Sequence, residues 1–248
     1  TDLFKWWGPF YDPTNNLGSG MDDFPRTDGW YFNKYSLDAT SWALFFTENM
    51  AIMAEEFESD NNFKLELKKR SERIRNNVYD KLLDKSDNIF KEKLSYLNYG
   101  SEKFSNHLGY PTLFPIIMGY ARKDSKELDA LLDFIRSEDH IWTQWGLRSL
   151  SQKDEYFGKD SNYWRGPIWI NINYLVLRGL KLYYSDNEKA MKIYEELRNN
   201  LMMNICTQRL QRGYFYEHYN QNRDGLGRGC HNFSGWTSLI TLIIAELY

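Results

Sequence analysis

The chain has 248 residues, enough for one large domain or two small ones, and its formal net charge of −3 offers no basic field for nucleic acid. Its 2 cysteines are too few for a disulfide framework or a structural zinc site, and no apolar run is long enough to span a membrane. The 9 Trp, 18 Tyr and 15 Phe are unusual, because many lie beside Gly, Asn and charged residues. Such aromatics either pack in the core or stack on flat ligands such as sugar rings.

Helical periodicity is the strongest local signal in the chain. Taken in chain order, it predicts helices at residues 38–57, 61–83, 111–121, 125–137, 168–184, 187–203 and 232–248. The first, third, fifth and seventh segments are poor in charge and rich in aromatic residues, Ala or Gly. The second, fourth and sixth are amphipathic; in the second, Leu67, Ile74 and Val78 keep the spacing of one helix face.

This alternation predicts inner and outer helices. A helix that is apolar all round is buried, whereas one with a single apolar face lies outside. Inner and outer helices that are joined as hairpins describe an all-α fold, the (α/α)6 toroid. Because a full toroid has six hairpins and the pattern here gives about three and a half, we expect only part of the barrel.

Three loop segments combine Gly, aromatic residues and charge. They are SGMDDFPR at 19–26, NYWRGPIWININY at 162–174 and GYFYEHYNQNRDGLGRGCHNFSGW at 213–236. Each leads into a charge-poor helix, so all three are predicted at one rim of the toroid. The aperiodic segment 137–167 belongs to the same set, because loops of that length inside compact domains are usually functional.

Two carboxylates in these loops are candidates for chemistry. Glu217 is flanked by four aromatic residues and His218, a setting in which burial favours a neutral carboxyl and hydrogen bonds favour an ionised one. Asp22 and Asp23 are adjacent like charges that Arg26 or a helix N-terminus could hold. Two carboxylates from distant positions in one pocket are the minimum for glycoside hydrolysis. The alternatives are a solvated loop for the Asp pair and an ordinary strand-end residue for Glu217.

Other motifs are weaker. Arg165 either clamps a ligand or forms a structural ion pair, while Trp164 is a platform or core and Trp169 favours the core. No nucleophile elbow, P-loop or dinucleotide fingerprint occurs, and the four histidines lack zinc spacing. The loop NQNRDG at 220–225 imitates half of an EF-hand, but His231 stands where Glu is needed, so we expect no calcium site of that type, while a looser loop calcium site stays open. The residues chosen as candidates include no metal ligand, and we expect no cofactor. The sequon at Asn232 is expected to lie in a helix N-cap region and to carry no glycan.

Together these stretches resemble glycoside hydrolase family 63, the processing α-glucosidase I (mannosyl-oligosaccharide glucosidase) family. The matching stretches are SGMDDFPR, WGLRSLS, YWRGPIWININYL, YEHYN and GLGRGCHNFSGWTSL, which keep the family's order over nearly the whole chain. The resemblance implies that residues 1–248 are the C-terminal portion of a single (α/α)6 glycosidase catalytic domain. An N-terminal β-sandwich and the first part of the toroid would precede them.

The resemblance also implies an activity and its residues. The family hydrolyses α-glucosidic bonds with inversion, and its eukaryotic members remove the terminal α-1,2-linked glucose from the N-glycan precursor oligosaccharide in the lumen of the endoplasmic reticulum. The first Asp of the family's S-G-[LM]-D-D motif is the general acid, here Asp22, and the Glu of Y-E-x-[YF] is the general base, here Glu217. Asp23 is then structural, as a backbone cap or as a partner of Arg26. The candidate substrate-binding residues in and beside these motifs are Arg26, Trp30, Asp38, Trp164, Arg165, Gly166, Tyr216, His231 and Trp236.

Some features depart from the family or stay open. Lys34 and Ser36 stand where the family's E-x-H-[VL]-D pattern has Glu and His, which weakens the transfer of exact specificity. A toroid glycosidase of trehalase-like or bacterial-type specificity and a non-catalytic carbohydrate-binding fragment are the alternatives. The chain starts without Met, which indicates a cut inside a larger protein. The resemblance implies a membrane anchor only in the missing upstream segment. Because the first part of the toroid is missing, we expect exposed apolar faces on the inner helices. Pairing of Cys206 with Cys230 is open.

Overall fold

The computed structural model describes all residues except 1, 8–16, 58–59, 98–99 and 223. The chain divides into two compact units, Thr1–Asn106 and His107–Tyr248, and each is described by itself. Both units are built mainly from helices, with short strands in the connections. No helix within the described ranges is both long and apolar enough to cross a membrane.

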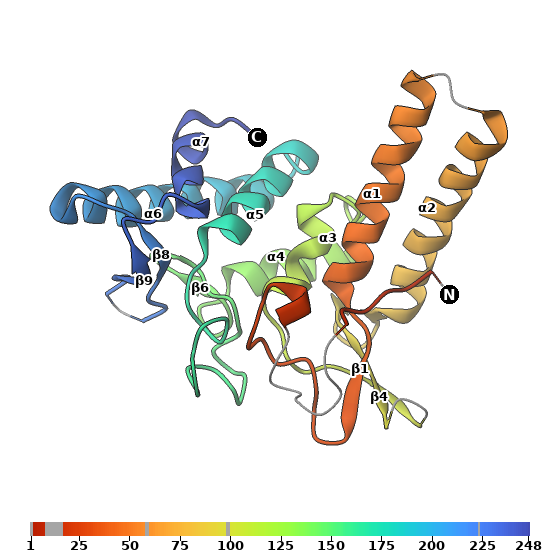
Figure 1. The fold of residues 1–248 in the computed structure, drawn as a ribbon, viewed down its shortest axis with the longest axis horizontal. Coiled ribbons are helices and arrows are strands. Elements are labelled where there is room, and N and C mark those ends of the chain that lie inside the picture. The colour runs from red at the N-terminus through yellow and green to blue at the C-terminus, as the bar shows by residue number, and fades with distance from the viewer. Residues whose placement is uncertain (1, 8–16, 58–59, 98–99, 223) are drawn as a thin grey trace. The chain divides into compact units, whose positions relative to one another are not determined.

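The first unit is built on a hairpin of two long helices, α1 (Leu37–Glu56) and α2 (Asn61–Lys81), which lie side by side (Figure 1). The carboxylate of Asp60 caps α2, because it accepts hydrogen bonds from the backbone N–H groups of Asn62 and Phe63. Helix α2 buries one face, as its spacing predicts, while α1 leaves large apolar side chains exposed. The exposed set on and just after α1 is Phe46, Met50, Ile52, Met53 and Phe57.

Short strands complete the first unit. The antiparallel sheet β1–β4–β5 pairs Phe32 with Ser95 and Leu94 with Lys103. Its strands are β1 (Tyr31–Tyr35), β4 (Lys93–Tyr96) and β5 (Glu102–Phe104), and a separate two-stranded sheet joins β2 (Leu83–Asp84) to β3 (Ile89–Phe90). The sheet brings the segment around Glu92 back towards the start of α1.

The second unit packs helices around a core of aliphatic and aromatic side chains that includes Leu113, Ile116, Leu131, Leu177 and Leu197. Its α-helices are α3 (Phe114–Ile117), α4 (Lys126–Arg136), α5 (Ile170–Tyr183), α6 (Glu188–Arg212) and α7 (Ile240–Ala245), with 3₁₀ turns η2 (Tyr110–Leu113) and η3 (Trp236–Leu239). A further 3₁₀ turn, η1 (Leu17–Ser19), belongs to the first unit.

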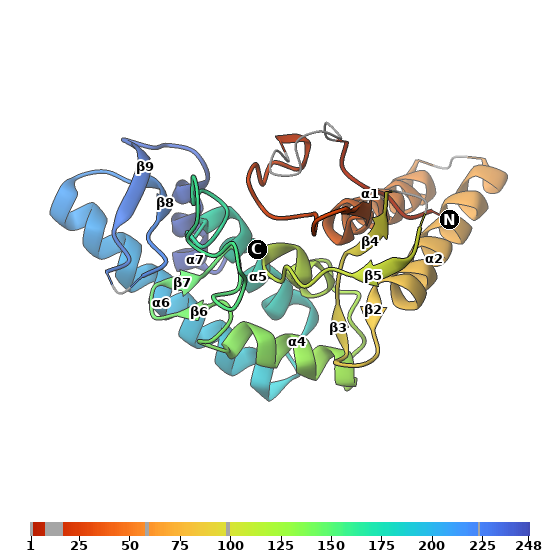
Figure 2. The same cartoon turned by 90° about the horizontal axis from the view of Figure 1, so that it is seen from below.

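Two β-hairpins lie in the connections between these helices. The hairpin β6 (Trp142–Thr143) and β7 (Gly146–Leu147) is short, whereas β8 (Tyr216–Tyr219) and β9 (Gly227–His231) form a longer one beside α6 (Figure 2). Backbone hydrogen bonds of 2.8 and 2.9 Å join Ile168 to Tyr219. Because Ile168 lies just before α5, this bridge fixes β8 against the segment 163–169.

The helix predictions hold in position and differ at the ends. The third predicted helix is shorter, since Gly119 at φ +70° cannot continue it. The sixth extends to Arg212 and ends at Gly213, which adopts the left-handed conformation. The seventh begins only after β9, so Asn232 is not a helix N-cap and that prediction is wrong. Asn232 is exposed with φ +59°, because the chain is still turning out of the strand there.

Candidate active site

The Asp22 loop belongs to the first unit and is held by short backbone bonds. Gly20, at φ +72°, closes the preceding turn, and its N–H donates to Leu17. Phe24 is fully buried, so the loop is anchored immediately after the two aspartates. Asp23 is buried as well, whereas Asp22 is half-buried. The adjacent carboxyls therefore lie in different environments, and Asp22 is the one open to a ligand.

Burial raises the pKa of Asp22, and the neighbouring charge of Asp23 raises it further. Both causes disfavour the ionised carboxylate. A group that must hold a proton until it donates it needs a shift in this direction. The charge of the buried Asp23 therefore helps to keep the more accessible Asp22 protonated.

At the end of this loop, the guanidinium of Arg26 binds two buried carboxylates. It donates to both oxygens of Asp38, at 3.1 and 2.6 Å, and to Glu92. All three side chains are buried. Although burial by itself would lower the pKa of Arg26, the charges of Asp38 and Glu92 raise it, so the guanidinium stays charged. The sequence suggested Arg26 as a partner of the Asp pair; it binds Asp38 and Glu92 instead.

Glu217 lies on β8 in the second unit and accepts hydrogen bonds at both carboxylate oxygens. The hydroxyl of Tyr163 donates to Oε1 at 2.5 Å, and the backbone N–H of Cys230 donates to Oε2 at 3.1 Å. The indole of Trp236 donates to the backbone oxygen of Glu217 at 2.6 Å. Gly229 passes close by at φ +72°, where a Cβ would overlap Oε2. Glu217 is therefore held as a hydrogen-bond acceptor in one orientation.

A group of aromatic side chains holds the residues that contact Glu217. The rings of Trp164 and Trp169 stack with centroids 3.8 Å apart and planes 6° from parallel. The Trp169 indole donates to the backbone oxygen of Tyr163 at 2.9 Å, which positions the tyrosine that contacts Glu217. His218 packs against Trp169 at 4.9 Å and Tyr163 at 5.3 Å. Trp169 is core, as predicted, and Trp164 is buried with it.

The other predicted substrate-binding residues fall into two groups. Arg165 is buried and paired with Asp160, with its guanidinium 5.2 Å from the Tyr156 ring, which is the structural alternative named for it. Gly166 takes φ +148° where a Cβ would come within 2.9 Å of Gln221. The accessible residues are Trp30 and His231, which are exposed, and Tyr216 and Trp236, which are half-buried.

Trp30, Arg26 and Asp38 belong to the first unit with Asp22, and the remaining predicted residues belong to the second unit with Glu217. Among the latter, the Trp236 indole contacts Glu217 directly. Arg26 and Asp38 contact each other, so they are placed to support the Asp22 loop.

Three contacts were not anticipated from the sequence: Tyr163, the N–H of Cys230, and Glu92. Tyr163 lies within the quoted stretch NYWRGP, and the GRG spacing before Cys230 signals a close backbone approach. Nothing in the sequence marked Glu92 as buried, because a charged residue between two short strands is usually exposed to solvent. Cys206 and Cys230 are free thiols, so they do not pair. Arg223 of the EF-hand-like loop lies outside the described residues.

Comparison with known sequences decides the family. The profile of the glycosyl hydrolase family 63 C-terminal domain matches residues 2–101 and 85–246. The chain belongs to this family. It is 35% identical over 256 residues to a probable mannosyl-oligosaccharide glucosidase of Schizosaccharomyces pombe and 32% identical over 258 residues to a mannosyl-oligosaccharide glucosidase of Saccharomyces cerevisiae. Each match covers 99% of this chain and 30% of the relative, so the chain spans about a third of their length.

Solved structures show the same fold. A family 63 mannosylglycerate hydrolase from Thermus thermophilus in complex with glucose matches with a TM-score of 0.63 and 19% identity, covering 85% of this chain and 48% of that one. A neutral trehalase from Saccharomyces cerevisiae matches with a TM-score of 0.61 and 13% identity, covering 90% and 39%. With the helices of both units, this likeness confirms the predicted all-α toroid class.

Proposed function

We propose that this family 63 chain carries both catalytic carboxyls of an inverting α-glucosidase, with Asp22 as general acid and Glu217 as general base. The observation that carries the proposal is the contrast between the two groups. The pKa of Asp22 is raised by burial and by Asp23, whereas both oxygens of Glu217 accept hydrogen bonds. The raised pKa of Asp22 suits a group that must hold a proton, and the hydrogen bonds to Glu217 fix it as an acceptor placed to take one.

In this mechanism Asp22 gives its proton to the glycosidic oxygen as the bond to glucose breaks. Glu217 removes a proton from a water that attacks the anomeric carbon from the opposite face. A single displacement of this kind needs about 6.5–9.5 Å between the carboxyls, against about 5–5.5 Å for retention. The Tyr163 hydroxyl and the Cys230 N–H then orient Glu217 toward the water.

We propose further that the substrate is an oligosaccharide that ends in α-1,2-linked glucose. The names of the fungal relatives, with their 99% coverage of this chain, support a glucosylated oligosaccharide as the substrate. The α-1,2 linkage is what the family resemblance implies. Residues 1–248 would be the C-terminal portion of a single catalytic domain acting in the lumen of the endoplasmic reticulum. Trp30, Tyr216, His231 and Trp236 would contact the sugar, since these predicted residues are exposed or half-buried.

The test uses the full-length enzyme with Asp22→Asn and Glu217→Gln. Loss of a general acid or base typically costs 10²–10⁴-fold, so each variant should lose about that much activity on glucosylated N-glycan. Only Asp22→Asn should keep substantial activity on α-glucosyl fluoride, whose leaving group needs no proton. NMR of the first product should show β-glucose.

Glu195→Gln, an exposed carboxylate on α6, serves as the control and should leave activity unchanged. α-Glucose as first product would contradict inversion. Full activity of either variant would remove that residue from the mechanism. Hydrolysis of free disaccharides in preference to the N-glycan would favour a trehalase-like specificity.

A further inference from the structure

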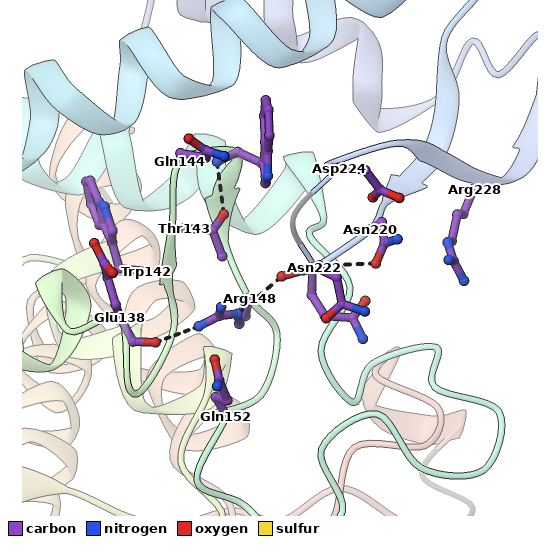
Figure 3. Close-up of a pocket in the computed structure, with 12 residues that line it drawn as sticks. Glu138, Trp142, Thr143, Gln144, Arg148, Gln152, Asn220, Asn222, Asp224 and Arg228 are labelled. Atoms are coloured by element: carbon purple, nitrogen blue, oxygen red, sulfur yellow. Dashed lines mark hydrogen bonds between the residues drawn. The ribbon is translucent and has the colours of Figure 1, made fainter.

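A cavity lies in the second unit, and the carboxylate of Glu217 is not among the residues that line it. Its volume is about 860 Å³, and it opens between the β6–β7 hairpin with its flanking loops and the loop that connects β8 to β9 (Figure 3). Figure 3 shows Arg148 and Gln152 on one side, and Asn222, Asp224 and Arg228 on the other. None of these residues belongs to the proposed acid and base machinery.

Charged side chains of both signs line the cavity. The described lining residues include two guanidinium groups, Arg148 and Arg228, and two carboxylates, Glu138 and Asp224. An anionic ligand would meet the carboxylates and a cationic one the guanidinium groups. A neutral ligand with many hydroxyl groups can use both, because guanidinium groups donate hydrogen bonds and carboxylates accept them.

Amide side chains also line the cavity. Gln144, Gln152 and Asn222 are exposed there, and their amide groups can both donate and accept hydrogen bonds. Gln221 is itself buried, and its Oε1, which has no partner in the described chain, is out of reach of solvent. The exposed amides are therefore the ones that a ligand in the cavity can contact.

An aromatic surface completes the lining. Trp145 is half-buried at the cavity, and its ring packs on Gly225, where a Cβ would come within 2.6 Å of the indole. Amides, charged groups of both signs and an indole together match a sugar, which offers hydroxyl groups at its edge and C–H groups on its face.

The cavity and Glu217 share one hairpin. Asn220 follows Glu217 by three residues, which corresponds to roughly 10 Å of extended strand, and Asn222 lies further along. The side chain of Gln208 on α6 fixes the loop, since it donates to Gly225 and accepts from Gly227, at 2.8 and 2.6 Å. A ligand in the cavity is thereby held at a set distance from the base.

We propose that this cavity is a distal subsite that binds a neutral sugar residue of the oligosaccharide, several units from the bond that is cleaved. The inference rests on the proposed function and names a further part of the same substrate. Short substrates that fill only the site at Glu217 do not reach the cavity. The subsite therefore contributes affinity for long oligosaccharides and leaves the chemical step unchanged.

The experiment combines Gln152→Ala and Asn222→Ala in the full-length enzyme. Losing two hydrogen bonds, together about 1.4 kcal/mol, should lower kcat/KM for a glucosylated high-mannose oligosaccharide about tenfold, through KM. Activity on an α-1,2-linked glucose disaccharide should stay within about twofold by the same reasoning. The matched control is Asn62→Ala with Gln211→Ala, two exposed amides away from the cavity.

The proposal is overturned if both substrates are affected equally or if neither is. Calorimetric titration of the oligosaccharide into Glu217→Gln enzyme, with and without the two cavity substitutions, separates it from the proposed function. Weaker binding after the cavity substitutions supports the subsite even if the wild-type enzyme hydrolyses neither substrate. Unchanged binding overturns the subsite even if hydrolysis is normal.

Discussion

His218 is adjacent to the proposed base in sequence but lies in a different environment. Its ring is buried among aromatic side chains, and burial lowers its pKa to about 4, with the charge of Arg228 acting in the same direction and that of Glu217 opposing it. Its Nδ1 has no hydrogen-bond partner among the described residues. His218 is therefore a neutral packing residue near neutral pH and does not compete with Glu217 for protons.

This shift makes stability depend on pH. Between pH 6.5 and about 4, the unfolded chain binds a proton at His218 that the folded chain does not, so stability is fully present above pH 6.5 and falls as pH falls. At pH 4 the free energy of unfolding should be lower by about 3 kcal/mol for this reason. His218→Gln should flatten this part of the curve in urea unfolding of the full-length protein, whereas exposed His231→Gln should not. Parallel curves for wild type and His218→Gln would contradict the assignment.

The β8–β9 hairpin determines where the proposed base points. Gly229 approaches Glu217 so closely that any Cβ would displace the carboxylate. Gly213, which ends α6, has a similar left-handed conformation at φ +88°, but its Cβ would meet no atom within 4 Å. Both glycines need a left-handed backbone conformation, but only Gly229 lies next to Glu217.

Substituting each glycine by alanine separates strain from function. Both variants should lose about 1–2 kcal/mol of stability, because L-residues rarely adopt this conformation. Only Gly229→Ala should also lose about 10²-fold in kcat, since a shift of about 1 Å in a catalytic group has that effect. Thermal unfolding and steady-state kinetics of the full-length enzyme check both. Equal activity of the two variants would mean that Glu217 is not held by this approach.

The sequence predicted elements well where one local pattern decides them. Helix α2 buries Leu67, Ile74 and Val78 as its spacing requires. Helix ends were less predictable, because they depend on single residues such as Gly213 and Gly119 whose backbone angles the pattern does not show. The motifs located the loops of both carboxyls. The partners of Arg26 and Glu217 come from distant segments, so only the folded structure shows that they are in contact.

At the scale of the molecule, the first unit depends on the buried cluster formed by Arg26, Asp38 and Glu92. It joins the Asp22 loop, the start of α1 and the segment before β4. Removing one member of a buried ion pair leaves an uncompensated charge, which typically costs about 3–5 kcal/mol. The pair of Lys34 with Glu102 connects β1 to β5 at the surface, where such pairs contribute about 0–1 kcal/mol.

Glu92 and Glu102 therefore provide a matched comparison between a buried and an exposed carboxylate. Glu92→Gln should destabilise the full-length protein by about 3–5 kcal/mol in urea unfolding, with activity lost in parallel as the Asp22 loop loosens. Glu102→Gln should cost under about 1 kcal/mol and leave activity intact. If Glu92→Gln were as stable and active as Glu102→Gln, the cluster would not be what supports the loop.

The stacked pair Trp164 and Trp169 has an optical consequence. Two indoles 3.8 Å apart and nearly parallel have transition dipoles that couple, so their absorption becomes shared rather than independent. The near-ultraviolet circular dichroism of the second unit therefore carries a signal from this pair. Since Trp169 also holds Tyr163 in position against Glu217, the pair is a built-in spectroscopic reporter on the order of the proposed base.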